Sequence, residues 1–468
     1  MSLLSAKELL PVVQVCHQLR SSVCEASFLW TGVDRIDEPS ALQFVLERSK
    51  DLPVSITNLR IEETDDVRLQ LIASHMSHVR VLGLSIAASF GNITHGTRAY
   101  TLFATPAPIL RRLSFTGPRD AENVGLPPVH VRSSSTKTSS FLFSGVAPQL
   151  DSLHVRGVQM TYPFLRRLPD LESLQTFSIG KTADFNISQA SLGQVASTIL
   201  SHLITLNVEL AGWETATSAP AFTTSLRRIN IRWTSRGPMV PDDAVPSHAA
   251  WKQVKLIHVT HVRETSSDCS SILSATIPAT CAPYQTICIR NSGTADRRIH
   301  VRAVDVEDRE RMLCGLHPST VAGLVSRIPA SRLSAITVTT AAVALGVLSN
   351  CVCPAVCRVR LVSNTNDVGW VNTFARDILS VTTLECIEFC IDANVSTFAW
   401  TDTALLRVLA CCMAAGSILN QVVFLGFEPE ARCVSQAATF ATRVVVDCDW
   451  REHSDERIWF ARPSFEWM

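Results

Sequence analysis

The feature that most constrains this chain is a short apolar pattern that returns along its length. The pattern is an apolar residue, two residues of any type, a second apolar residue, one residue of any type, and a third apolar residue. The last two apolar positions are two residues apart, which is the spacing of a β-strand with one buried face. The first position lies three residues earlier, where a turn leads into the strand. Eleven copies are ITNLRI (56–61), VRVLGL (79–84), LRRLSF (110–115), LDSLHV (150–155), LITLNV (203–208), LRRINI (226–231), VKLIHV (254–259), YQTICI (284–289), LSAITV (333–338), VCRVRL (356–361) and LECIEF (384–389), and LESLQTFSI (171–179) is a looser version.

Segments with the apolar spacing of an α-helix lie between many of these copies. One places Leu42, Val45, Leu46 and Ser49 on a single side, and another does the same with Trp370, Phe374 and Ile378. Further segments of this kind are GQVASTILSHL (193–203), STVAGLVSRI (319–328) and EARCVSQAATFAT (430–442). Strands that alternate with helices predict an α/β fold whose parallel sheet is covered by helices.

Two intervals interrupt the alternation and are predicted to be insertions. The first, residues 117–140, is rich in Pro, Ser and Thr and is expected to be an exposed loop. The second covers residues 291–317. In it Ile299, Val301 and Ala303 alternate with polar residues, and an Asn-Ser-Gly turn separates them from YQTICIRN (284–291). We therefore expect these two stretches to pair as a β-hairpin.

Composition and charge exclude several classes of protein. Of 468 residues, 46% are apolar and 18% are charged, which favours an ordered chain. The 42 Lys and Arg equal the 42 Asp and Glu, so no net charge attracts nucleic acid or anionic lipid. The apolar run ALLRVLACCMAAGSIL (404–419) contains Arg407 and predicts a buried helix instead of a membrane span. The start MSLLSAKELL lacks the features of a secretory signal, so we expect a cytoplasmic or nuclear protein with reduced cysteines.

A search for catalytic or metal-binding residues yields no site. The cysteines of CVCPAVC (Cys351, Cys353 and Cys357) lack a second ligand pair and surround a copy of the repeated pattern, so core packing is favoured over zinc. The pairs His75/His78 and His258/His261 are predicted to be solvated or hydrogen-bonded. The sequence has no HExxH motif, no nucleophile elbow and no phosphate-binding glycine loop. We therefore predict no catalysis, no cofactor and no metal.

The repeated pattern resembles the strand segment L-x-x-L-x-L of leucine-rich-repeat proteins over roughly residues 54–425. The resemblance implies an irregular leucine-rich-repeat solenoid, with short parallel strands on one face and helices on the other. The copies are spaced less regularly than family repeats of about 20–29 residues. A compact α/β domain with several buried strands stays open as the alternative.

The N-terminus resembles the second half of an F-box motif, which ends in L-L-x-x-x-x-V-C-x-x-W-R followed later by L-W. The matching residues are Leu9, Leu10, Val15, Cys16, Arg20, Leu29 and Trp30, while Leu19 replaces the motif's Trp. From Pro11, an apolar stripe of Val12, Val15, Cys16 and Leu19 is spaced as one face of a helix. The phrase LERSKDLPVSI (46–56) is similar to one found in fungal F-box proteins with degenerate leucine-rich repeats.

This resemblance implies a substrate-recognition subunit of a cullin-type (SCF) ubiquitin ligase with no catalysis of its own. Residues 1–34 would be a partial F-box-like segment, in which Leu9, Leu10, Val15, Cys16, Leu19 and Arg20 contact a Skp-type adaptor. Leu29 and Trp30 would join it to a repeat array at 35–468 that holds an unknown protein target. The front helix of the motif, L-P-x-E-[IL]-L-x-x-[IL]-F, does not precede Leu9 in this sequence. The alternative is therefore a leucine-rich-repeat scaffold whose N-terminus only caps the array.

Overall fold

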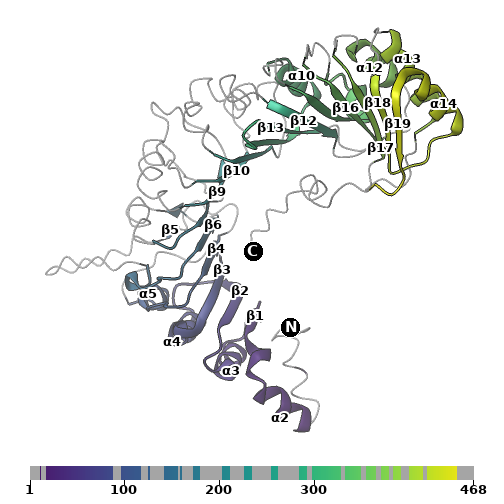
Figure 1. Cartoon of the computed structure of the whole chain (residues 1–468). Coiled ribbons are helices and arrows are strands. Elements are labelled where there is room, and N and C mark those ends of the chain that lie inside the picture. The colour runs from purple at the N-terminus through teal and green to yellow at the C-terminus, as the bar shows by residue number, and fades with distance from the viewer. Residues whose placement is uncertain are drawn as a thin grey trace, which may run out of the picture. The chain divides into compact units, whose positions relative to one another are not determined.

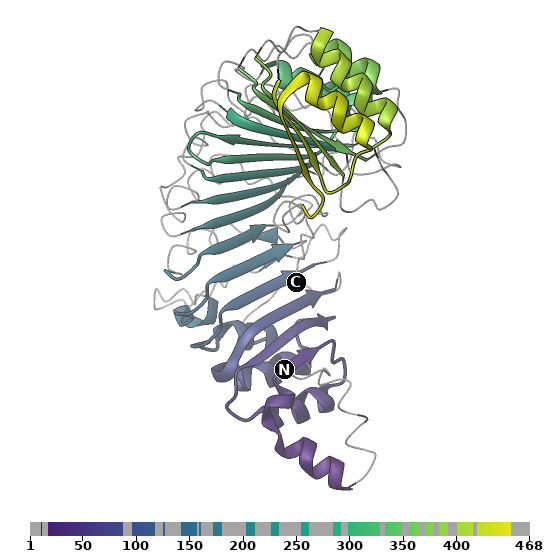
Figure 2. The same ribbon diagram turned by 45° about the vertical axis from the view of Figure 1, so that its right-hand side comes forward.

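A computed structural model gives the structure of the chain as a mixed α/β protein (Figures 1 and 2). Its described residues fall into two compact units, one up to Ile229 and one from Asn230 onward. The structure describes residues 11, 17–87, 96–117, 125–126, 142–156, 159–160, 172–179, 203–210, 226–233, 254–261, 284–291, 298–327, 333–348, 355–364, 370–378, 383–391, 400–414 and 419–450.

The first unit alternates short helices with parallel strands. Its helices are α2 (His17–Glu25), α3 (Pro39–Ser49), α4 (Val67–Ser74) and α5 (Arg98–Ala104), with the 3₁₀ turns η1 (Ser27–Trp30), η2 (Met76–His78) and η3 (Leu142–Gly145). Its strands are β1 (Gly32–Asp34), β2 (Val54–Ile61), β3 (Val79–Ile86), β4 (Arg112–Thr116), β5 (Gly125–Leu126), β6 (Ser152–Arg156), β7 (Gln159–Met160), β8 (Thr176–Ile179) and β9 (Thr205–Leu210). The order β1-β2-β3-β4-β6-β8-β9 is parallel throughout, and β5 pairs with β7 separately.

The second unit has longer strands and a more complete set of helices. Its strands are β11 (Leu256–His261), β12 (Tyr284–Asn291), β13 (Ile299–Asp305), β14 (Glu310–Leu316), β15 (Ala335–Thr339), β16 (Arg358–Ser363), β17 (Cys386–Ile391), β18 (Leu419–Leu425) and β19 (Ala441–Asp447). Its helices are α10 (Pro318–Arg327), α11 (Thr340–Ala344), α12 (Trp370–Ile378), α13 (Asp402–Ala414) and α14 (Ala431–Phe440). The strand β10 (Arg228–Trp233) contains the point where the chain passes from the first unit to the second.

Strand order in the second unit departs from chain order at one place. The strand β12 pairs with β13 in antiparallel fashion, as the sequence predicts for residues 284–291 and 299–303. The strand β14 then returns antiparallel to β13 and lies beside β11, whereas β12 lies beside β15. The resulting order is β11-β14-β13-β12-β15-β16-β17-β18-β19, in which β13 alone among these described strands is antiparallel. The predicted insertion at 291–317 thus contributes two strands to the sheet.

The repeated apolar pattern supplies the core, and the predicted parallel α/β architecture is confirmed. Each of the eleven copies coincides with a strand, and every copy position whose side chain is described is at most 8% exposed, the maximum being Leu206. Burying one such Leu, Ile, Val or Phe stabilises the fold by about 1.5–3 kcal/mol. The predicted helical faces are also buried, because Leu42, Val45, Leu46 and Ser49 of α3 have no exposed surface. The stretch 193–202 and most of 117–140 lie outside the described residues.

A backbone hydrogen-bond motif recurs at the start of successive strands. The carbonyl of Arg111 accepts from the amides of Asp151 and Ser152, both at 3.0 Å. The carbonyl of Glu385 accepts in the same way from Asn420 and Gln421, at 2.8 and 3.0 Å. Five further carbonyls each accept from two neighbouring amides in the same way, those of Asp151, Gln175, Ile204, Ser334 and Cys357. At these seven carbonyls, two neighbouring amides fix one strand to the next in parallel register.

Helices cover one face of the strands in each unit. In the first unit, Phe103 of α5 packs edge to face on Phe115 of β4, with ring centroids 5.4 Å apart. In the second, Trp400 packs on Phe389 of β17 and on Trp370 of α12, and Figure 1 shows α12, α13 and α14 together over β16–β19. Among the described residues, no helix is both long enough and apolar enough to cross a membrane.

Candidate functional site

The predicted adaptor-binding segment is described only in part. Leu9, Leu10, Val15 and Cys16 lie outside the described residues, and so does most of the stripe that begins at Pro11. Leu19 and Arg20 belong to α2, and the side chain of Arg20 is exposed. The adaptor-contacting role of these residues stays a prediction.

Trp30 lies where α2 meets the first strands. It is fully buried, its indole Nε1 donates to the carbonyl of Val23 at 2.9 Å, and its ring packs edge to face on Phe44 of α3 at 5.4 Å. Leu29 beside it is half-buried. Immediately after Trp30, β1 pairs in parallel with β2. Trp30 therefore joins α2 to α3 by a hydrogen bond to one helix and packing on the other, and its role as an F-box junction stays a prediction.

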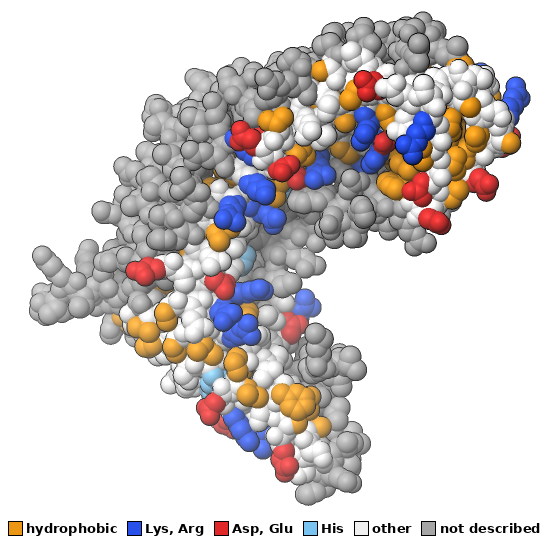
Figure 3. Space-filling model, in the orientation of Figure 1, with side chains coloured by type: hydrophobic (Ala, Val, Ile, Leu, Met, Phe, Trp, Pro, Cys, Tyr) orange, Lys and Arg blue, Asp and Glu red, His pale blue; other side chains and the backbone are white. Residues whose placement is uncertain are grey.

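The face of the first unit's sheet opposite to the helices, which we call the first open face, carries polar side chains. On β4, Leu113 and Phe115 are buried on the helix side, so Arg112, Ser114 and Thr116 point to the other side. Register places Arg112 beside Ser152, and Ser114 beside His154. The sequences of β3, β4, β6 and β8 contain no Asp or Glu, whereas Arg112 and Arg156 lie on this face. Figure 3 shows Lys and Arg side chains gathered over the strands of this unit.

Two hydrogen-bonded pairs organise the centre of the first open face. Ser152 Oγ and His154 Nε2 are 2.8 Å apart, and on the next strands Asn207 donates through Nδ2 to Ser178 Oγ at 2.8 Å. Burial, and secondly the positive charge of Arg112, lower the pKa of His154, so its imidazole is neutral at pH 7. In the described part of the chain, no carboxylate contacts His154 to orient it. The Ser152–His154 pair therefore lacks the third group that a nucleophilic triad uses.

The corresponding surface of the second unit, the second open face, combines an ionic ladder with apolar side chains. Arg360 Nε contacts Glu388 Oε2 at 2.6 Å, and Arg358 Nε lies 3.7 Å from Glu388 Oε1. Glu388 is only 7% exposed although it is charged, which the two guanidinium groups make favourable. Arg360 also lies over the ring of Trp450, 5.6 Å from its centroid.

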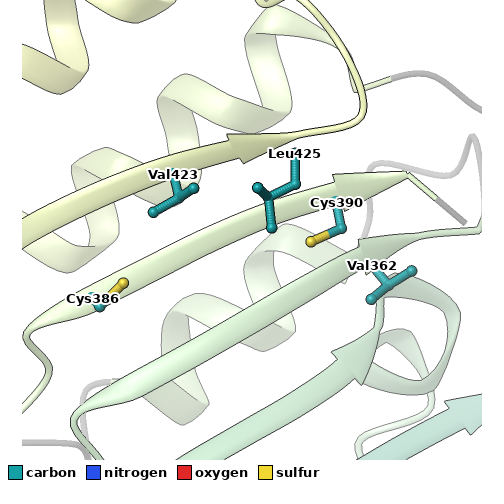
Figure 4. Packing of buried hydrophobic residues seen from close by; sticks show 5 residues of the cluster. All are labelled: Val362, Cys386, Cys390, Val423 and Leu425. Carbon is teal, nitrogen blue, oxygen red and sulfur yellow. The ribbon is translucent and has the colours of Figure 1, made fainter. Parts of the chain in front are cut away.

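An apolar cluster on the second open face lies next to this ladder. It consists of Val362, Cys386, Cys390, Val423 and Leu425, with Val445 and Trp450 packed against it. Figure 4 shows the five core members on the side of the strands away from the helices. The open sides of β17 and β18 therefore carry apolar side chains around Glu388, which distinguishes the second open face from the polar first open face.

The cysteine and histidine groups that the sequence singled out are packed or hydrogen-bonded. Cys357 donates to the carbonyl of Ser334 at 3.4 Å, whereas Cys351 and Cys353 lie outside the described residues. His75 and His78 pack edge to face, with ring centroids 5.1 Å apart, and burial lowers the pKa of both. His258 Nε2 lies 3.3 Å from Cys314 Sγ, as the hydrogen-bonded interpretation predicts. Within the part of the chain that the structure describes, no group of three or more His, Cys, Asp or Glu could hold a metal ion.

Buried thiols in this protein are protonated and poorly nucleophilic. Burial raises the pKa of Cys314 and of Cys412 to about 12, and that of Cys386 to about 11. A thiol reacts as the thiolate, so these cysteines behave as small apolar residues. Cys386, Cys390 and Cys412 are accordingly buried among apolar side chains.

Sequence reasoning did not single out His154, Arg360 or Glu388 of the two open faces. His154, Arg360 and Glu388 all occupy the variable positions of the repeated pattern, between buried neighbours. Reading those positions across successive copies is the signal that could have found them.

No family model matches this chain, and no curated protein matches its sequence.

Proposed function

We propose that this chain is a non-catalytic protein-interaction module, built as an irregular leucine-rich-repeat solenoid that binds a protein target on its open faces. The observation that carries the proposal is that the apolar and the variable positions of a copy lie on opposite sides of its strand. Its apolar positions are buried on the helix side, while the variable positions place Arg112, His154 and Arg360 on the opposite side. Neighbouring strands about 4.8 Å apart turn these variable positions into continuous rows, which suit an extended protein surface.

The first open face favours a partner segment rich in Asp and Glu. Arg112 and Arg156 project from strands that contain no carboxylate, and neutral Ser, Thr and Asn side chains separate them. Complementary charge of this kind raises association rates and selects partners more than it adds affinity. We therefore expect binding that weakens with ionic strength.

The F-box resemblance supports a role in a cullin-type ubiquitin ligase, in the cytoplasm or the nucleus. In this role residues 1–34 bind a Skp-type adaptor. Trp30 holds α2 against α3 through its contacts with Val23 and Phe44. The competing proposal is a leucine-rich-repeat scaffold without adaptor binding.

The experiment that tests the target-binding surface combines affinity capture with cross-linking mass spectrometry. The full chain is compared with the variant Arg112→Glu/Arg156→Glu on the first open face. A matched variant, Arg407→Glu, reverses an exposed charge on α13 instead. We expect captured partners to cross-link near the first open face and to be lost only in the double variant. Equal loss in the helix variant, or cross-links confined to the helices, would contradict the proposal.

A further inference from the structure

The last described strand, β19, has an unpaired outer edge. It follows α14 directly, since Phe440 ends the helix and Ala441 begins the strand. It pairs in parallel with β18 on one side, through Gln421–Arg443, Val423–Val445 and Leu425–Asp447. Among the residues that the structure describes, no strand is registered against its other side, and β2 is already paired with β1 and β3.

The edge lacks several of the devices that prevent strands from pairing further, and its two charges have opposite sign. The sequence ATRVVVD contains no Pro, no Lys and no bulge, and three consecutive valines occupy its centre. Val446 is 40% exposed. The two charged residues of the strand, Arg443 and Asp447, are exposed, and neither forms an ion pair within the described part of the chain.

Backbone directions fix which residues an added strand would meet. The carbonyl of Asp447 accepts from the amide of Gly426 at 2.8 Å, so Asp447 directs its backbone groups toward β18. Backbone direction alternates along a strand, so Arg443 and Val445 also face inward. The amides and carbonyls of Thr442, Val444 and Val446 consequently face the free edge.

We propose that this edge pairs with β19 of a second copy of the chain, in an antiparallel register centred on Val445. In this register Val444 is opposite Val446 of the partner subunit, and this pair forms hydrogen bonds in both directions. Arg443 is opposite Asp447 of the partner subunit, and the two-fold axis repeats the pair on the other side of Val445. Both charged pairs lie at non-hydrogen-bonded positions, where opposed side chains are closest.

Charge complementarity selects this register over its neighbours. Centring the pairing on Val444 places Arg443 opposite an apolar valine and Asp447 opposite Ala441. Centring it on Val446 places Asp447 opposite Val445 and Arg443 opposite Asp449, which lies beyond the end of the strand at Asp447. The register centred on Val445 is the one of these three that pairs Arg443 with Asp447. Edge pairing over seven residues is small compared with standard interfaces of about 1,600 Å², so we expect a dissociation constant on the order of micromolar.

Sedimentation equilibrium of the full chain tests this proposal with charge-reversed variants. The wild type is expected to interconvert between the 51.2 kDa chain and a species of twice that mass over about 1–100 µM. Arg443→Asp and Asp447→Arg each create two like-charge pairs and should raise the dissociation constant at least about tenfold. An equimolar mixture of these two variants restores both opposite-charge pairs, so it should dimerise like the wild type.

Two controls make the result decisive. The double variant Arg443→Asp/Asp447→Arg should recover self-association, whereas Arg407→Asp, at an exposed position of α13, should leave the wild-type constant unchanged. A wild type that stays monomeric up to about 100 µM would overturn the proposal. So would a dimer insensitive to both single reversals, a mixture that fails to associate, or assembly beyond the dimer.

Discussion

Truncating Phe389 to alanine tests whether the repeated pattern supplies the core of the second unit. The Phe389 side chain has no exposed surface, stacks on Phe424 at 5.5 Å and meets Trp400 edge to face at 5.1 Å. Removing a buried Phe side chain costs about 3–5 kcal/mol, and each aromatic pair contributes about 0.5–1.5 kcal/mol beyond its buried area. We therefore expect Phe389→Ala to lower the free energy of unfolding by about 4 kcal/mol.

Urea unfolding followed by tryptophan fluorescence measures this loss, because Trp400 reports on the same contact. The matched control is Phe28→Ala, which removes a side chain that is 62% exposed and should change the unfolding free energy by less than about 0.5 kcal/mol. Phe389→Leu keeps most of the apolar volume and should recover more than half of the loss. A loss below about 1 kcal/mol for Phe389→Ala, or an equal loss for Phe28→Ala, would refute the assignment of this position to the core.

Three further predictions concern pH, thiol reactivity and a buried ion pair. Burial lowers the pKa of His75, His78 and His154, so the unfolded state binds more protons below about pH 6.5. The unfolding free energy should then fall as the pH is lowered through that value, and less steeply in His78→Gln; a flat profile from pH 7.5 to 5.5 would contradict this. Maleimide labelling of the native protein, followed by mass spectrometry, should show modification of exposed Cys448 within minutes and none of Cys412. Labelling of Cys412 before Cys448 would contradict this prediction. Asp66→Ala removes the cap of α4 and the 2.6 Å ion-pair partner of buried Arg68. Urea unfolding should therefore show a free energy of unfolding lower by about 2–4 kcal/mol. A decrease below about 0.5 kcal/mol would contradict a stabilising role for this ion pair.

Much of the sheet could be predicted from local spacing, but several strands were missed, among them β18, whose sequence carries the pattern. Leu419, Val422 and Phe424 of β18 are buried and occupy the three apolar positions. Val423 and Leu425 between and after them are also apolar, because they belong to the cluster on the second open face. A strand buried on both faces loses its alternation, so spacing alone does not reveal it.

The interchange of strand neighbours near β13 could not be predicted from the sequence. Local alternation and the Asn-Ser-Gly turn predict that residues 299–303 return along β12, and they do. The choice of β11 as the neighbour of β14 depends on contacts between residues far apart in the chain. One such contact is the hydrogen bond from Arg311 Nη1 to the carbonyl of Val254, at 3.0 Å. Arg311 is 1% exposed, an environment that its charge alone would not predict.

The candidate site was less predictable than the fold. The resemblance at the N-terminus directed attention to Leu9, Leu10, Val15 and Cys16, which the structure does not describe. The strand register is needed to show which variable positions of separate copies lie side by side on an open face, as Ser114 and His154 do. Neighbours on a parallel sheet lie tens of residues apart in the chain, so no local window of sequence brings them together.

Titration of the full chain with a purified Skp-type adaptor, followed by calorimetry, tests the proposed ubiquitin-ligase role most directly. We expect a one-to-one complex with a dissociation constant below about 1 µM, a value within the range of specific protein interfaces. Trp30→Ala should weaken it, because the variant loses the contacts to Val23 and Phe44 that hold α2 against α3. Arg407→Glu on α13 should leave the affinity unchanged. The absence of any complex at about 100 µM adaptor would contradict the ligase role and leave the scaffold without adaptor binding as the function.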